Sequence, residues 1–384
     1  MAELRQNTWT LDEWYAQSVA GNADYQGEGR AFAWGMNNEG VIGTNDRVQR
    51  SSPVQIPGTT WSSLSVTDYS HASFGLKTDG SLWSWGSGGD GMLGQGGPNA
   101  SKSSPIQIGT DTTWRRIRSA GYGGMATKTD GTLWMWGKNG QGSLGQNNRT
   151  EYSSPRQVGT ETTWSDNFEC SPYISLATKT DGTLWVWGRN NNGVLGLNEP
   201  ASVPSTGFWK SSPTQIPGTT WSTTAGQLDA NPGGACCMKT DNTAWWWGRN
   251  TTSSKGPGAP NQVSSPTQIG APGGRTWSRI CSGNYDSMGL TTDGYWWQWG
   301  SNNYIPPNMQ ELGQGYSEID MWKGANTTKS GLKSDGSLYL KGEGNYGVLG
   351  QNSTADSLTT LVQIPGTWTQ PVKGERTNGA CQNI

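Results

Sequence analysis

The chain has a single histidine, His71, and histidine is the side chain that most often serves as a general base near neutral pH. A Ser-His-Asp triad would have to be built on this residue, within the run Ser70-His71-Ala72-Ser73 that lies between predicted strands. We interpret His71 instead as a hydrogen-bonding residue at the surface or between neighbouring structural units.

Two other patterns offer chemistry, namely the repeated Asp-Gly pairs and the glycine-rich run from Ser87 to Gly91. Aspartate before glycine is explained by turn formation, and no pair of these aspartates stands out as an acid and a base. The glycine-rich run lacks the Lys-Ser/Thr of a phosphate-binding loop. We therefore expect no catalytic residue, no metal site and no cofactor, and hence a protein that is not an enzyme.

The cysteines are odd in number and have no Cys-x-x-Cys spacing, which argues against a disulfide framework and a zinc site. They are expected to be reduced and buried. The five are Cys170, Cys236, Cys237, Cys281 and Cys381.

The elements that would position these residues are set by an internal repeat, marked by a Trp-Gly pair. The pairs begin at Trp34, Trp85, Trp136, Trp187, Trp247 and Trp299. The first four are 51 residues apart, and Lys341-Gly342 is an eroded seventh copy. Seven units therefore fill the chain.

Within a unit, an Asp-Gly turn separates two short β-prone runs, as in the segment from Gly75 to Gly86, which predicts a β-hairpin. Ten residues before each Trp-Gly pair lies a small residue, which we expect where sheets converge near a common axis. These residues are Gly75, Ala126, Ala177, Cys237, Gly289 and Gly331. Three columns of tryptophan account for most of the 23 tryptophans, and we expect them to pack between adjacent sheets.

The two ends of the chain complement each other. The C-terminal unit stops before its Asp-Gly turn, and the segment from Glu28 to Gly35 aligns with the missing half of that unit. One unit is therefore expected to combine strands from both termini, which closes a ring and removes free sheet edges. This predicts an all-β domain over residues 28–384, preceded by an extension over residues 1–27.

Composition narrows the possible partners. With 27 Lys and Arg against 29 Asp and Glu, the net charge of −2 gives no electrostatic reason to expect nucleic acid. No apolar run approaches the length of a membrane span, and no secretion signal is recognised at the start. We expect neither nucleic-acid binding nor membrane insertion.

The run from Lys128 to Gly145, Lys-Thr-Asp-Gly-Thr-Leu-Trp-x-Trp-Gly-x-Asn followed by Gly-x-Leu-Gly, resembles the repeat of the regulator of chromosome condensation family. The resemblance covers residues 28–384 and implies a seven-bladed β-propeller with about fifty residues per unit. It implies little about activity, because this fold hosts different binding roles. Composition and the N-terminal run from Thr8 to Tyr15 are also similar to structural proteins of tailed bacteriophages.

Departures from the repeat mark candidate contact sites. The longest is the segment from Leu197 to Lys210, where Phe208 and Trp209 lie outside the tryptophan columns and are candidate binding anchors, unless both rings fold back on a neighbouring blade. In the extension, a capping box at Thr10 predicts a short amphipathic helix that docks on the propeller or on a partner subunit. Its apolar face would carry Leu11, Trp14, Tyr15 and Val19.

Two function hypotheses follow. The first is a non-enzymatic phage virion protein, a head or tail decoration subunit or a fibre-associated adhesin, located in the virion after assembly in the host cytoplasm. Its partners would be other virion proteins, or a host surface glycan or receptor. The alternative is a cytoplasmic regulatory propeller that binds proteins, such as a GTPase exchange factor or another interaction module.

Overall fold

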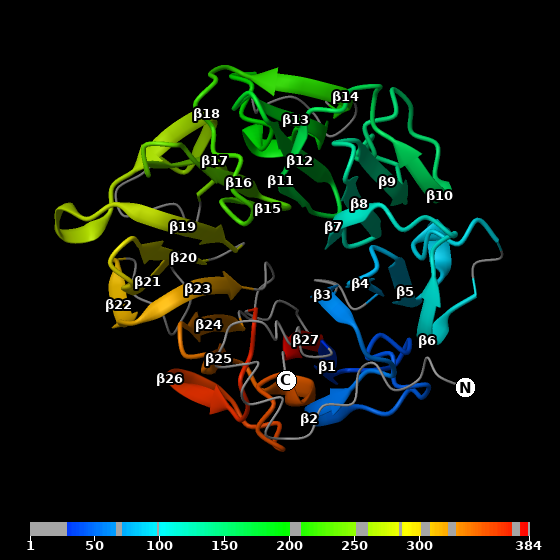
Figure 1. Cartoon of the computed structure of the whole chain (residues 1–384). Coiled ribbons are helices and arrows are strands. Elements are labelled where there is room, and N and C mark those ends of the chain that lie inside the picture. Colours follow the sequence, from blue (N-terminus) through cyan, green and yellow to red (C-terminus); the bar gives the residue numbers. More distant parts are fainter. Residues whose placement is uncertain are drawn as a thin grey trace, which may run out of the picture.

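Each repeat unit folds into one small antiparallel sheet, because short β-prone runs joined by tight turns pair with their sequence neighbours. In the computed structural model, seven such sheets, or blades, surround a common axis (Figure 1). The structure describes residues 29–66, 71–97, 100–199, 209–250, 260–283, 286–300, 308–321, 328–370 and 377–382. The prediction of a seven-bladed all-β propeller is confirmed.

The blades are numbered along the chain, and their strands are named in sequence order. Blade 1 contains β1 (Arg30–Gly35), β2 (Arg50–Gln55) and β27 (Thr377–Gln382). Blade 2 contains β3 (Trp61–Ser65), β4 (Ala72–Lys77), β5 (Leu82–Gly86) and β6 (Lys102–Gln107). Blade 3 contains β7 (Trp114–Ser119), β8 (Gly123–Lys128), β9 (Leu133–Gly137) and β10 (Tyr152–Gln157). Blade 4 contains β11 (Trp164–Cys170), β12 (Ile174–Lys179), β13 (Leu184–Arg189) and β14 (Trp209–Ile216).

The remaining three blades follow the same order. Blade 5 contains β15 (Leu228–Asn231), β16 (Gly234–Met238), β17 (Ala244–Arg249) and β18 (Gln262–Ile269). Blade 6 contains β19 (Trp277–Ser282), β20 (Asp286–Thr291), β21 (Trp296–Gly300) and β22 (Gln310–Gly313). Blade 7 contains β23 (Tyr316–Met321), β24 (Lys329–Lys333), β25 (Leu338–Gly342) and β26 (Ser357–Ile364). Four single-turn 3-10 helices lie in the connections, η1 (Gly89–Gly91), η2 (Asn191–Gly193), η3 (Pro272–Gly274) and η4 (Asn345–Gly347).

Blade 1 closes the ring with strands from both ends of the chain, as predicted. β27 pairs antiparallel with β1, with Phe32 opposite Ala380 and Trp34 opposite Asn378. In Figure 1 the red β27 lies beside the dark blue β1. This pairing closes the ring of blades.

The tryptophans of the Trp-Gly pairs join neighbouring blades. Their side chains are fully buried, and in five of them the indole nitrogen donates a hydrogen bond to a backbone carbonyl of the preceding blade's connection. Trp187, for example, donates to the carbonyl of Ser143 at 2.8 Å. A buried indole N–H needs such a partner, so the column both fills and orients the space between sheets. The predicted packing of tryptophan between sheets is confirmed.

The column of small residues lies on the second strand of each blade from blade 2 to blade 7. A Cβ atom at Gly75 would lie 2.6 Å from the Trp61 ring, and one at Gly289 would lie 2.2 Å from the Trp277 ring. At these two positions the residue must be small because the tryptophan that begins the inner strand packs against it. The prediction that the column marks the convergence of the sheets stays a prediction.

The Asp-Gly turns form as predicted. Gly131 has a φ of 78°, which is the left-handed region that glycine adopts without strain. The Asp130 carboxylate accepts hydrogen bonds from the backbone N–H and the hydroxyl of Thr132, at 3.0 and 2.6 Å. In blade 5 the glycine is replaced by Asn242, whose φ is 62°. These aspartates are therefore turn residues.

The histidine and the cysteines, the side chains with the most reactive chemistry in this chain, pack against their neighbours. The His71 ring stacks on Tyr122 of the next blade, with ring centroids 5.4 Å apart. All five cysteines are buried and free of disulfides. Burial raises the pKa of the Cys381 thiol to about 12 and also raises the pKa of Cys237. A thiol with a raised pKa forms little thiolate and is a poor nucleophile near neutral pH.

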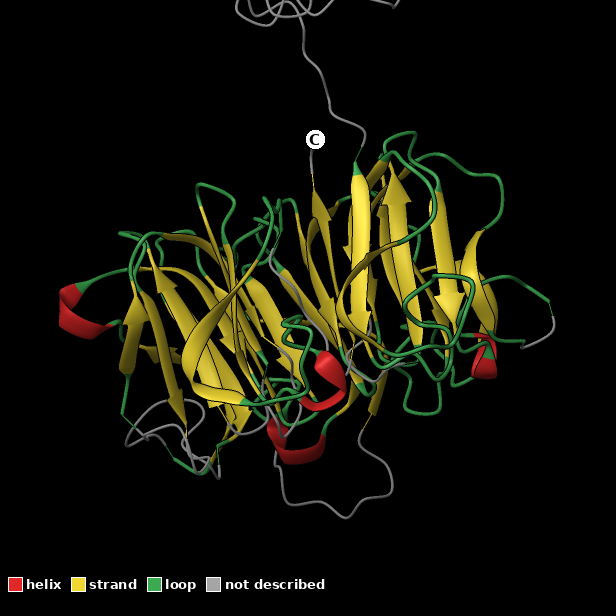
Figure 2. Cartoon of the chain, turned by 90° about the horizontal axis from the view of Figure 1, so that it is seen from below, coloured by secondary structure: helices red, strands yellow, loops and turns green. Residues whose placement is uncertain are grey.

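The predicted boundary between an extension over residues 1–27 and the propeller lies outside the described residues and stays a prediction. In the part of the chain that is described, no helix has the length and apolar character needed to cross a bilayer. Figure 2 views the ring from its side and shows the strands of each blade running between its two faces.

Candidate binding channel along the propeller axis

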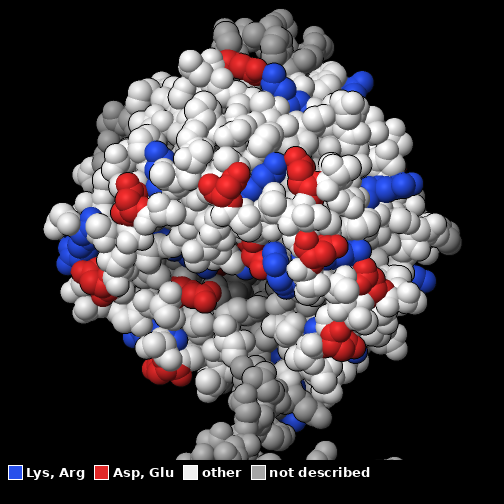
Figure 3. Space-filling view, turned by 45° about the horizontal axis from the view of Figure 1, so that its top comes forward, with Lys and Arg blue, Asp and Glu red and all other residues white. Residues whose placement is uncertain are grey.

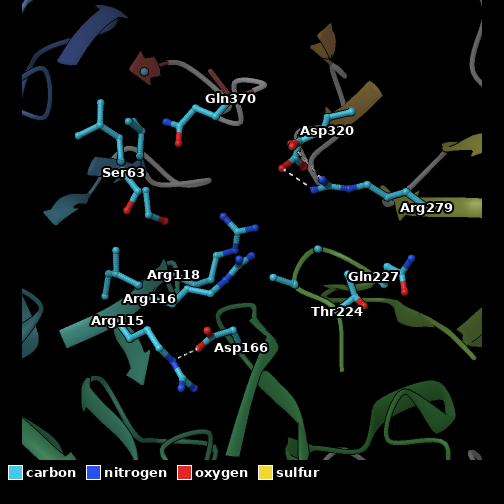
Figure 4. Close-up of a pocket in the computed structure, with 18 of the residues that line it drawn as sticks. Ser63, Arg115, Arg116, Arg118, Asp166, Thr224, Gln227, Arg279, Asp320 and Gln370 are labelled. Carbon is cyan, nitrogen blue, oxygen red and sulfur yellow. Dashed lines mark hydrogen bonds and ion pairs between the residues drawn. The ribbon is translucent and has the colours of Figure 1, made fainter. Parts of the chain in front are cut away.

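The innermost strands of the blades surround a channel at the centre of the ring. Its cavity has a volume of about 480 Å³ and is lined by side chains from β3, β7, β11, β19 and β23, together with the segment that precedes β15 (Figure 4). A volume of this size falls in the range of small-molecule sites. Most of the lining is polar or charged, with arginine as the dominant basic residue.

One mouth of the channel lies on the same face as the Asp-Gly turns. The first residue of an inner strand pairs with the last residue of the second strand, as Trp114 does with Lys128 directly before the turn at Asp130. Residues just after the strand start, such as Arg115 and Asp166, therefore form the rim of this mouth. Residues further along the strands, such as Arg118 and Asp320, lie deeper.

An ion pair between neighbouring blades forms one side of the rim. The Nε atom of Arg115 lies 2.9 Å from Oδ1 of Asp166, and about a third of each side chain is exposed. The same carboxylate oxygen accepts a hydrogen bond from the Thr127 hydroxyl at 2.6 Å. This pair joins blade 3 to blade 4 and presents both charges to solvent.

Across the channel, Arg279 of blade 6 contacts two carboxylates of blade 7. Its guanidinium lies 3.2 Å from Asp320, which is deep and only 7% exposed, and 3.7 Å from Glu318, which is 47% exposed at the rim. Burial alone would lower the pKa of Arg279, but the neighbouring carboxylates of Asp320 and Glu318 favour its charged form, and its pKa is raised above its usual value. Arg279 is therefore a firmly charged group.

Two further arginines come from β7. Arg118 lies 3.6 Å from the buried carboxylate of Glu169. Arg116 has no ion pair among the described residues, and its Nε has no hydrogen-bond partner there. In Figure 4 the guanidinium groups of Arg116 and Arg118 point toward the middle of the channel, and Arg279 extends toward it from the other side. Burial, and then the charges of Arg118 and Arg279, lower the pKa of Arg116 to about 9.

The outer surface has a different character from the channel. Figure 3 shows acidic and basic side chains interspersed over the face that is drawn, around a hollow near its middle. No field of one sign covers this face. The channel instead gathers arginines, and the carboxylates paired with most of them, around one axis.

The chemistry that this arrangement supports is binding. Guanidinium groups donate hydrogen bonds in a fixed planar pattern that suits carboxylate and phosphate oxygens. Among the described residues, no three His, Cys, Asp or Glu side chains are grouped so that they could hold a metal ion. The channel therefore offers charged contacts for an anionic or mixed-charge group of a ligand.

The predicted contact residues lie elsewhere or outside the described residues. Trp209 begins β14, the outermost strand of blade 4, and pairs with Arg189 at the end of β13. This position is at the face opposite the Asp-Gly turns. The ring is half-buried, with the Arg149 guanidinium 4.3 Å from its centroid. Phe208 and the N-terminal Leu11, Trp14, Tyr15 and Val19 lie outside the described residues, so their roles stay predictions.

Sequence reasoning did not find the arginines of the channel. They lie in two segments about 160 residues apart, and alignment of the repeats treats the positions after the inner-strand tryptophan as variable. The sequence does hold a signal at the positions that follow the inner-strand tryptophans. Trp114 is followed by Arg115, Arg116 and Arg118, and Trp277 is followed two residues later by Arg279. Because inner strands face the axis, basic residues at these offsets in two units indicate a basic channel.

The sequence profile of the regulator of chromosome condensation (RCC1) repeat matches residues 28–70, 79–127, 130–177 and 181–223. The chain is 27% identical over 179 residues to the RCC1 domain-containing protein RUG3, mitochondrial, of Arabidopsis thaliana, covering 44% of this chain and 40% of that one. It is 27% identical over 172 residues to the E3 ubiquitin-protein ligase HERC2 of Homo sapiens, covering 43% of this chain and 4% of HERC2. It thus spans less than half the length of these curated relatives.

Solved structures have the same fold at low sequence identity. Human WBSCR16 superposes with a TM-score of 0.76 at 16% identity, over 92% of this chain and 99% of that one. Yeast RCC1 (Prp20), solved bound to Kap60, superposes with a TM-score of 0.78 at 16% identity, over 92% and 89%. Prp20p of Saccharomyces cerevisiae superposes with a TM-score of 0.76 at 17% identity, over 93% of each chain. That structure is described together with the binding of Prp20p to Gsp1p and histones. At such identities the likeness concerns the fold alone.

Proposed function

Because the chain carries regulator of chromosome condensation repeats in an RCC1-like seven-bladed propeller, we propose that it is a non-enzymatic, intracellular regulatory propeller. In this proposal it binds a partner protein at the mouth of its axial channel. The seven blades act as a rigid frame that holds charged side chains from several units at one place.

The observation that carries the proposal is the rim of the channel. Arg115, Asp166 and Glu318 come from three different blades, keep between about a third and a half of their side-chain surface exposed, and include charges of both signs. Exposed charges of both signs on a rigid frame favour recognition of a complementary charged surface, since they steer association and fix orientation. Elsewhere, the repeated aspartates and tryptophans are already used by the fold.

The comparisons support protein binding in the coarse sense. Prp20 has been solved with Kap60, and Prp20p was described with its binding to Gsp1p and histones. These partners are those of the similar proteins. The virion hypothesis has no support among the relatives named above, which favour the regulatory alternative.

The similarity to HERC2, a ubiquitin ligase, is compatible with a chain that is not an enzyme. The ligase activity in that protein's name belongs to a chain of which the matched region forms 4%. The matched region here is the propeller repeat, whose channel offers binding groups. A partner protein that itself carries an activity, such as a small GTPase, would fit the same proposal.

The proposal is tested by affinity capture with the full chain and charge-reversed rim variants. The test variant combines Arg115→Glu with Glu318→Lys, which keeps the net charge and alters two blades of the rim. We expect proteins captured by the wild type to be lost by this variant. A captured set unchanged by the rim variant would refute the proposed site.

Two matched controls separate the rim from the rest of the surface. Arg156→Glu reverses an exposed charge on the outer strand β10, and Trp209→Ala alters the opposite face. Both controls should capture the same partners as the wild type. If Trp209→Ala loses capture and the rim variant keeps it, the binding surface lies at Trp209, the anchor predicted from the sequence, and not at the rim.

A further inference from the structure

Among the described residues of the channel, Arg116 is the arginine that has no ion pair. Its guanidinium forms no ion pair and no hydrogen bond with any described residue, and its Nε is buried. The nearest ring, that of Phe168, lies 5.9 Å away and gives only a weak cation–π contact. A desolvated positive charge without a partner is costly, so its retention calls for an explanation.

The neighbours of Arg116 increase this cost. Arg118 from the same strand and Arg279 from across the channel act on Arg116 as like charges, and the charges of Glu169 and Asp166 offset them only in part. The acids nearest to those two arginines, Glu169 for Arg118 and Asp320 for Arg279, are already engaged with them. The three guanidinium groups therefore face three carboxylates, Glu169, Glu318 and Asp320, all of which lie beside Arg118 or Arg279 and leave Arg116 without an ion pair among the described residues.

We propose that Arg116, Arg118 and Arg279 form a binding site for one phosphate group carried by a small phosphorylated molecule. The site faces the axis of the channel beside the rim assigned to a partner protein, and Arg118 extends it further inward. The inference goes beyond the proposed function and does not depend on it.

The geometry favours phosphate over carboxylate. The arginines approach from β7 and from β19, on different sides of the channel (Figure 4). A carboxylate presents two oxygens in one plane, which a single guanidinium satisfies, whereas a phosphate monoester presents three terminal oxygens in diverging directions. Donors from several directions therefore match the tetrahedral group.

The acids of the channel limit the charge of the ligand. Glu169, Glu318 and Asp320 lie beside the same arginines and would repel a chain of phosphates. One phosphate matches Arg116, which has no ion pair among the described residues, together with its two neighbours, whose charges are shared with carboxylates. The cavity of about 480 Å³ leaves room for the rest of a small molecule, lined by hydrogen-bonding residues such as Thr224 and Gln370.

The test is isothermal titration of the full chain with inorganic phosphate and with glucose 6-phosphate, each at constant ionic strength set by sodium chloride. Sulfate and a phosphoserine peptide are titrated in parallel. We expect saturable binding of the phosphorylated probes at one site. Heats that cannot be distinguished from those of added chloride would overturn the proposal.

The key variant is Arg116→Gln, with Arg156→Gln on the outer strand as its matched control. Arg116→Gln should weaken phosphate binding at least tenfold, whereas Arg156→Gln should leave it unchanged. Without phosphate, Arg116→Gln should melt at the same or a higher temperature than the wild type, because it removes a partly buried charge that has no ion pair among the described residues. A residue kept only for structure would give a lower melting temperature.

Arg116→Lys provides a second variant that keeps the charge and removes the planar pattern of donors. It should fold and bind phosphate several-fold more weakly than the wild type. Equal binding by wild type, Arg116→Gln and Arg116→Lys would overturn the site. If only the phosphoserine peptide binds in an Arg116-dependent way, the phosphate site stands but its small-molecule source is wrong.

Discussion

The Nζ atom of Lys341 lies 3.5 Å from Oε1 of Gln298, across the boundary between blades 7 and 6. Lys341 occupies the position where the other units carry the tryptophan of the Trp-Gly pair. It is 5% exposed, and Gln298 is fully buried. The eroded repeat has thus replaced an apolar ring with a buried charge. Burial, and then the charge of Lys329, lower the pKa of Lys341 to about 8, although Asp286 opposes the shift.

This lysine should make stability depend on pH. Its proton is bound less tightly in the folded state than in the unfolded state, where the pKa is about 10.4. The unfavourable contribution of its charge to stability is therefore complete below about pH 8 and disappears as the pH rises from there toward about 10.4. Lys341→Met should stabilise the protein at pH 7 by about 1 to 3 kcal/mol. Denaturant unfolding at several pH values measures the difference in unfolding free energy between Lys341→Met and the wild type. This difference should vanish as the pH approaches about 10.4, the pKa of the unfolded state. A constant difference would contradict the buried-charge account.

The small residue of each second strand gives a prediction about packing. Gly289→Ala places a methyl group against the Trp277 ring, where the Cβ would lie 2.2 Å from the nearest ring atom. The ring must move, so we expect a loss of about 1 to 3 kcal/mol in the free energy of unfolding. Gly270→Ala is the control, because nothing lies within 4 Å of its Cβ position. Equal unfolding free energies for the two variants would show that the ring does not require the glycine.

The ion pair between Asp111 and Lys128 predicts a different dependence on pH. Burial would raise the pKa of Asp111, but hydrogen bonds from Lys128 and Thr113 and the charge of Lys128 lower it to about 2. The stabilisation is therefore present above pH 4 and is lost as the pH falls toward 2. Because the Asp111 side chain is 35% exposed, Asp111→Asn should cost at most about 1 kcal/mol at pH 7.

Thermal unfolding of Asp111→Asn and wild type between pH 2 and pH 7 checks this prediction. The two melting temperatures should converge at the acid end. Glu161→Gln is the matched control, since Glu161 lies 3.0 Å from Lys179 in the next blade but is 47% exposed. It should change the melting temperature less than Asp111→Asn does. A larger effect of Glu161→Gln would contradict the role assigned to burial.

Local and periodic features could be predicted from the sequence. The turn at Asp130 and Gly131 and the tryptophan at 136 recur in register, so each unit specifies its own hairpin and its own contact with the next blade. The closing pair of β1 and β27 followed from aligning the ends with complete units. The contact between Gly289 and the Trp277 ring could not be predicted in this way, because the ring comes from another strand of the blade.

The axial channel could not be predicted from such periodicity. Arg116 and Arg279 meet because the ring brings β7 and β19 to opposite sides of one axis, and no local pattern records that distance. Trp209 stood out because it departs from the repeat, yet it lies at the opposite face from the channel mouth. A departure from a repeat marks a residue that the fold does not need. It does not show whether that residue lies near other candidate binding residues.

Hydrogen–deuterium exchange of the full chain, free and bound to a captured partner, tests the central claim most directly. If the rim of the channel is the protein-binding surface, binding should slow exchange in the inner-strand segments 63–66, 115–118 and 317–320. Outer strands such as β10 and β14 should exchange at unchanged rates. Protection confined to β14 and the neighbouring face, with no change in the inner strands, would contradict the account.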